Sequence, residues 1–158
     1  TNYDFLFEGA GQGCSFLIEK NLFLNYQYFV KNNYHIVSSF VFHDWLTYLY
    51  LRSTKRNWKF IKKPLLKYRI HRTNSFGDKY SLRGIYIRVI KLFNGWYYNQ
   101  VLLANKISRI VDNELPDFNE ITTYQFVTLL VLNGRRRISD RIITFFSLLI
   151  LKILKKIF

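Results

Sequence analysis

The chain changes character at Gly77, and this change limits the architectures that it can adopt. Before Gly77, short apolar and aromatic runs are separated by a glycine cluster and by Pro64, which favours strands alternating with helices. After Gly77, apolar residues recur at helical spacing, with breakers at Gly95 and Pro116. We therefore expect an α/β part followed by a helical C-terminal region.

The strongest strand signal is the alternation in residues 65–71, which directs Arg69 and His71 to the same face. Residues 14–18 follow the glycine cluster and predict a short buried strand. Residues 34–42 are rich enough in β-branched and aromatic side chains to lead toward the face that carries the candidate site. Helices are expected in residues 19–30, from Asp44 to Leu51, and in residues 81–93, 96–112 and 121–132.

The net charge of +14 is concentrated in two segments. Residues 52–72 hold nine Lys or Arg and no acid, and residues 134–158 hold seven Lys or Arg against Asp140 alone. Such patches attract polyanions, phosphorylated ligands or anionic lipid. The first patch is equally consistent with a solvated basic face.

Residues 135–158 form an amphipathic pattern. Their longest uncharged run, residues 142–151, is ten residues long, whereas a bilayer span needs roughly 20. This helix is expected to lie on a membrane or, alternatively, to pack on the core of the fold. Its polar side carries Arg137, Arg141, Thr144, Lys152 and Lys155, and its apolar side carries Ile142, Phe146, Leu149, Ile150, Ile153 and Ile157.

The chain has 158 residues, begins at Thr1 and contains no methionine, so we expect it to be a piece of a longer protein. It is long enough for a real hydrophobic core. Cys14 is the one cysteine, which fits a reducing cytoplasmic setting, and we expect it to be a small buried side chain.

Asp44 and His71 are rare titratable groups in apolar and basic surroundings, so they are candidate site residues. Each also has a purely structural interpretation. Asp44 fits the first turn of a helix, where free amides favour a carboxylate, and His71 fits the end of a strand. The glycine cluster that contains Gly11 and Gly13 is equally consistent with a plain turn.

Three motifs in order carry a family resemblance: Gly11-Gln12-Gly13-Cys14, then His43-Asp44-Trp45, then Pro64-Leu65-Leu66-Lys67-Tyr68-Arg69-Ile70-His71 with Asn74. They resemble the C-terminal half of family 2 glycosyltransferases, in the rhamnosyltransferase-like subgroup with a GT-A (Rossmann-like) fold. The resemblance implies three parts: residues 1–79 as the acceptor side of the catalytic domain, residues 80–133 as a helical extension, and residues 134–158 as a basic membrane-associating helix.

The resemblance also implies roles for individual residues. Asp44 would be the catalytic base of an inverting transfer, and His71 would help to hold Mg²⁺ or Mn²⁺. The substrate-binding residues would be Gly11, Gln12, Gly13, His43, Trp45 and Arg69, although from the residues alone His43 fits a structural role better than a ligand role. No Asp-x-Asp metal motif occurs in the chain, so the donor-binding half is expected upstream and the chain alone is expected to be inactive.

The leading hypothesis is therefore part of a glycosyltransferase of cell-surface polysaccharide synthesis. It would move a sugar from a nucleotide-sugar donor to a saccharide or lipid-linked acceptor, at the cytoplasmic inner face of the membrane and without a nucleic-acid partner. Two alternatives remain. Trp58 and Phe60 in the basic segment suit a nucleic-acid-binding module, and the C-terminal helix suits a non-catalytic membrane-surface adaptor.

Overall fold

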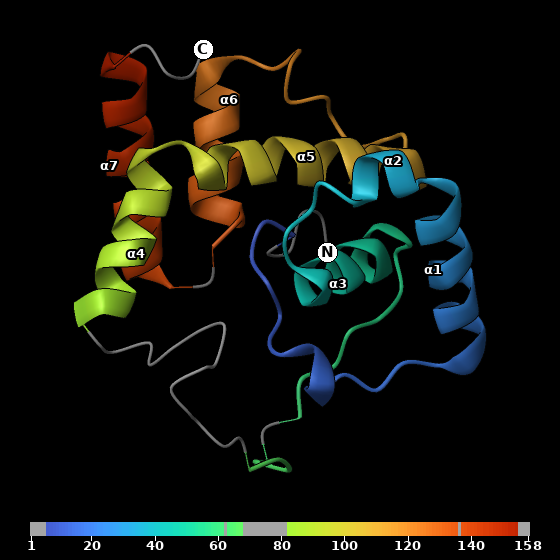
Figure 1. The fold of residues 1–158 in the computed structure, drawn as a ribbon. Helices are drawn as coiled ribbons and strands as arrows, with labels where there is room; N and C mark the ends of the chain where they lie inside the picture. Colours follow the sequence, from blue (N-terminus) through green and yellow to red (C-terminus); the bar gives the residue numbers. More distant parts are fainter. Residues whose placement is uncertain (1–5, 62, 68–81, 136, 155–158) are drawn as a thin grey trace.

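The computed structural model describes residues 6–61, 63–67, 82–135 and 137–154, and these residues form helices joined by loops (Figure 1). A 3₁₀ turn at Gly13–Ser15 precedes the first α-helix, and a π-helical segment at Leu129–Asn133 continues α6. The α-helices are α1 (Lys20–Asn32), α2 (Tyr34–Val37), α3 (His43–Ser53), α4 (Leu82–Phe93), α5 (Trp96–Val111), α6 (Thr123–Thr128) and α7 (Ile138–Ile153).

The helices expected from periodicity are confirmed, and local signals set where several of them begin. Gly95 adopts a left-handed backbone (φ 83°) immediately before α5, a conformation that glycine adopts without the steric cost of a side chain. Thr122 and Gln125 form a capping box at the start of α6, in which each side chain bonds to the backbone N–H of the other residue. These local bonds satisfy amides that a helix start otherwise leaves unpaired.

The expected α/β architecture with a GT-A fold is wrong for this chain, because the described residues contain no strand. The run 14–18 includes part of the 3₁₀ turn, with Leu17 fully exposed, and the segment 34–42 begins with helix α2. Residues 65–67 are exposed and irregular, and the rest of that predicted strand lies outside the described residues. A short apolar run does not by itself distinguish a strand from other structure, and a strand needs a partner to pair its backbone groups.

Helix α5 crosses the molecule and divides it into two groups of helices (Figure 1). It packs against α2 and α3 on one side and against α4 on the other, where α4 also packs against α7. The core is continuous across the expected boundaries at 79/80 and 133/134, because Trp45, Tyr97 and Leu148 belong to one buried cluster. The described residues therefore show no boundary between the three predicted parts, and the separate functional roles of these parts stay predictions.

Two buried aromatic side chains tie the segment before the 3₁₀ turn to this core. The indole Nε1–H of Trp45 donates to the carbonyl of Leu6 (2.7 Å), and the hydroxyl of Tyr97 donates to the carbonyl of Phe7 (2.8 Å). Burial raises the pKa of Tyr97 to about 12, so its hydroxyl keeps the proton that this bond requires.

Helix α7 exposes its apolar side to solvent. Its inward face is small and partly polar, with Thr144, Ser147, Leu148 and Leu151 buried. The sequence pattern placed Thr144 on the polar side of this helix. Part of the polar side therefore packs against the rest of the protein. Of the apolar residues that the pattern placed opposite, Ile157 lies outside the described residues, and the others are exposed: Ile142, Phe146, Leu149, Ile150 and Ile153. None of the helices within the described ranges has the length and apolar character that a membrane span requires.

Leu49 tests the importance of the core that α3 forms with its neighbours. Its side chain is 0% exposed, so Leu49→Ala leaves a cavity and should lower the free energy of unfolding by about 2–5 kcal/mol. Leu17→Ala is the matched control, because Leu17 is 99% exposed and should change stability by less than about 0.5 kcal/mol. Urea unfolding followed by circular dichroism measures both, and equal midpoints would contradict this core.

Candidate functional site

The structure brings the glycine cluster against the start of α3. A Cβ atom added to Gly13 would lie 3.2 Å from Nε2 of His43 and 3.5 Å from Cβ of Asp44. Two of the motifs that were matched from sequence are therefore neighbours in space, although about thirty residues separate them along the chain. The close approach depends on the missing side chain at Gly13.

Asp44 lies in the first turn of α3 and is half-buried, while the adjacent His43 is exposed. One carboxylate oxygen, Oδ1, accepts a hydrogen bond from the backbone N–H of Trp45 (2.8 Å). No side chain of the described residues donates to the second oxygen. The start of a helix stabilises a negative charge, so the carboxylate is held in one orientation with an oxygen available for a further partner.

A hollow of about 510 Å³ opens beside His43, and its size lies in the range of small-molecule sites. Asp44 does not line this hollow, but it is a neighbour of Gly13, which does. A largely apolar wall with one imidazole and one hydroxyl can hold the ring of a sugar while orienting it through few polar bonds. The lining residues are Gly13, Phe16, Leu17, Ile18, Phe23, His43 and Thr47.

The remaining predicted substrate residues occupy different surroundings. Gly11 and Gln12 are exposed in the loop that leads to the 3₁₀ turn. Trp45 is 4% exposed and packs against Phe40 and Tyr97, so it contributes to the core and fixes the position of its neighbour Asp44. Its predicted role as a wall of the acceptor pocket has no support in this placement.

Arg69 and His71 lie outside the described residues, so their predicted roles in binding the substrate and the metal stay predictions. The described residues do not by themselves fit a metal ion, because they contain no group of three His, Cys, Asp or Glu side chains close enough to share one. Three or more such ligands are the usual minimum for a protein-held metal. The Mg²⁺ or Mn²⁺ prediction therefore enters none of the chemistry derived below.

Sequence reasoning missed the residues that shape the hollow. Thr47 lies one turn after His43, and its hydroxyl bonds to the His43 carbonyl (2.8 Å) and to the Tyr26 hydroxyl (3.2 Å). The spacing of Thr47 four residues after His43 on a predicted helix was the available signal. Cys14, expected to be buried, is exposed.

Trp58 of the first basic segment also contributes to the packing near the hollow. Its ring meets the edge of Phe16 at 5.0 Å and of Tyr48 at 4.8 Å between centroids. Phe60 lies next to it, with its ring centroid 6.2 Å away. Trp58 therefore supports the wall that Phe16 provides, which weakens its interpretation as a free platform for stacking nucleic-acid bases.

The chain is 32% identical over 118 residues to the dTDP-rhamnosyl transferase RfbG of Shigella flexneri. The chain is related to a glycosyltransferase. The match covers 73% of this chain but 41% of that protein, so the chain spans less than half the length of its curated relative. No family model and no solved structure matches the chain.

This relation confirms the coarser part of the sequence hypothesis, a link to rhamnosyltransferases. The assignment to family 2 and the catalytic role of Asp44 stay predictions.

Gly13→Ala tests the contact between the glycine cluster and α3. Gly13 has no left-handed backbone, so the effect depends on space alone, and the new methyl group should push the exposed His43 ring aside. We expect shifted NMR signals of the His43 ring and the Asp44 amide, with less than about 1 kcal/mol of lost stability.

Gly9→Ala is the matched control for this substitution. Its added methyl group would meet Trp45 Cβ at 3.8 Å, an ordinary contact, so the His43 and Asp44 signals should stay unchanged. Unchanged spectra in Gly13→Ala would show that the two motifs do not touch.

Proposed function

We propose that this chain is the acceptor-side part of a glycosyltransferase that moves rhamnose or a similar sugar from a nucleotide-sugar donor to a saccharide or lipid-linked acceptor. The observation that carries the proposal is the meeting of Gly13, His43 and Asp44 beside an open hollow, in a chain related to a dTDP-rhamnosyl transferase. The family 2 character and inversion at the anomeric carbon belong to this proposal.

Asp44 is the proposed base. The acceptor hydroxyl gives its proton to the Asp44 carboxylate while its oxygen bonds to the anomeric carbon, and the bond from that carbon to the nucleoside diphosphate breaks. The bond from the Trp45 N–H fixes Oδ1, which favours proton transfer to the other oxygen. His43, exposed at the edge of the hollow, is placed to bind a substrate hydroxyl.

Asp44→Asn in the full protein that carries this sequence tests the base. The amide cannot take the proton, so transfer to a soluble acceptor should fall by about 10²- to 10⁴-fold, while binding of dTDP-rhamnose measured by calorimetry stays unchanged. Asp140→Asn is the matched control, because Asp140 also lies in the first turn of a helix, α7, and should keep near-normal turnover. Turnover of Asp44→Asn equal to that of the control would remove Asp44 as the base.

The outward apolar side of α7 supports a location at a membrane surface. Helix α4 packs beside α7 and also exposes apolar side chains, namely Tyr86, Ile87, Val89 and Ile90. Basic residues Lys91, Arg141 and Lys152 lie on the same two helices, in a chain of net charge +14. Apolar side chains that enter the acyl boundary with cations at the headgroups are the usual arrangement of an interfacial helix. We assign this face to the cytoplasmic, anionic leaflet.

Phe146→Glu tests the membrane face. Phe146 is 53% exposed, so the protein should fold normally, but binding to vesicles that contain phosphatidylglycerol should fall at least about tenfold in a sedimentation assay. Tyr124→Glu on α6 is the control, because Tyr124 is also exposed but lies on another helix. Unchanged vesicle binding, or a dimer in solution that Phe146→Glu dissociates, would show that lipid is not the partner of this face.

A further inference from the structure

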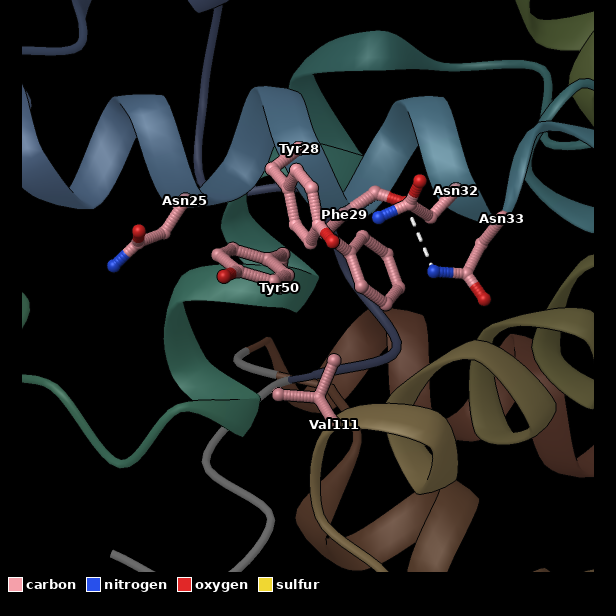
Figure 2. Close-up of a pocket in the computed structure, with 7 residues that line it drawn as sticks. All are labelled: Asn25, Tyr28, Phe29, Asn32, Asn33, Tyr50 and Val111. Carbon is pink, nitrogen blue, oxygen red and sulfur yellow. Dashed lines mark hydrogen bonds between the residues drawn. The ribbon is translucent and has the colours of Figure 1, made fainter.

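A second hollow, of about 370 Å³, lies between α1, α3 and the end of α5 and has no role in the chemistry proposed above. Figure 2 shows Tyr28 and Phe29 of α1 next to Tyr50 of α3, with Asn25 on one side of them, Asn32 and Asn33 on the other, and Val111 of α5 across the hollow. The hollow is open and lies within the size range of small-molecule sites. Its lining residues are Asn25, Tyr28, Phe29, Asn32, Asn33, Tyr50 and Val111.

The lining is neutral, polar and aromatic, with three amides, two phenols, one phenyl ring and one valine. This composition is unusual for a chain of net charge +14, in which a site for a phosphate or a nucleic acid would be expected to use Lys or Arg. The amides and phenols both donate and accept hydrogen bonds. Such groups match a ligand that presents neutral hydroxyls in several directions, next to ring faces that cover its apolar parts.

The polar groups of α1 are presented outward and are available. Asn25, Tyr28 and Asn32 recur at intervals of three and four residues, which places them on one side of the helix. The amides of Asn25 and Asn32 make no hydrogen bond to any described residue, and both side chains are exposed. Asn33 differs, because its amide N–H donates to the Phe29 carbonyl (2.9 Å) and so closes the end of the helix.

The floor of this hollow is rigid. Tyr50 is 7% exposed, and its ring packs against Phe29 and Tyr26 with centroid distances of 4.9 and 5.3 Å. Burial raises the pKa of Tyr50, so its hydroxyl stays neutral. A ring held on one side by two others offers a fixed surface, which limits the ordering cost of binding.

The two hollows lie along the same helix pair. Phe23 of α1 and Thr47 of α3 line the hollow beside His43, and Phe29 and Tyr50 line the second one. Tyr26 lies between them and contacts both Thr47 and Tyr50. Tyr50 follows Asp44 by six residues, which is about 9 Å along a helix axis. At 100° per residue, Phe23 lies on the opposite side of α1 from Tyr28 and Asn32, so a chain of sugar units must pass around the contact of Tyr26 with α3 to reach both hollows.

We infer that the hollow of Asn25, Tyr28, Asn32 and Tyr50 is a saccharide-binding subsite, which holds a neutral sugar unit of the acceptor away from the reacting hydroxyl. Its assignment to the acceptor rests on the proposed function, whereas saccharide binding itself follows from the lining. Polar contacts from the amides would orient the unit, and the ring of Tyr28, which is 71% exposed, would cover one face of it, with the buried Tyr50 supporting the floor.

The test uses oligorhamnosides of two, four and six units as probes of the full protein. Wild-type affinity, measured by calorimetry, should rise with length, because only the longer probes reach both hollows. Tyr28→Ala combined with Asn32→Ala should lower affinity for the six-unit probe about tenfold and leave the two-unit probe unchanged. In a transfer assay, KM for a long acceptor should rise while kcat and the KM of the donor stay the same.

The matched control is Tyr124→Ala combined with Asn99→Ala. These residues are exposed on α6 and α5, away from the hollow, and should change none of the readouts. Equal affinity of both double variants for the six-unit probe, or no binding of any probe to the wild type, would overturn the subsite. Length-dependent binding without any transfer activity would support the subsite and reject the proposed function. Normal transfer, with a KM for the long acceptor that the Tyr28→Ala and Asn32→Ala double variant leaves unchanged, would support the proposed function and reject the subsite.

Discussion

The burial of Trp45 is the constraint on which the arrangement of the candidate site depends. Its ring lies between Phe40 and Tyr97, and its indole N–H bonds to the Leu6 carbonyl. This single side chain therefore links α3, α5 and the segment that leads to the glycine cluster. An aromatic residue buried with its polar atom satisfied contributes several kcal/mol, which favours this placement of the start of α3.

The position of Trp45 dictates where its neighbours lie. Successive residues of a helix point about 100° apart, so a ring directed into the core leaves His43 and Asp44 near the surface. Because the Leu6 carbonyl is bonded to Trp45, the following residues return past the same end of α3, and Gly13 meets the His43 ring. The charged group is therefore held in place by an apolar neighbour that takes no part in the chemistry.

Sequence periodicity predicted the helices well but not the fold class. Helices such as α5 are long enough for the spacing of their apolar residues to distinguish the 3.6-residue repeat of a helix from the alternation of a strand. Residues 14–18 are too few to distinguish these two repeats. Their apolar side chains line the hollow beside His43, which the sequence pattern does not reveal. At the site, the sequence named Gly13, His43 and Asp44 as candidate residues, but their contact appears only in the structure, and the interior position of Trp45 depends on Tyr97, a partner far along the chain.

Helix α1 shows how a lightly packed element gains a role. It buries no residue completely and holds its place through the half-buried Tyr26, Phe29 and Val30. Its outer positions are therefore free of packing demands, and solubility alone would be met by charged residues, which also favour helices more than asparagine does. The exposed amides of Asn25 and Asn32 favour helix less than charged residues would and contribute nothing to the core. They are therefore available to the saccharide that we infer for this hollow.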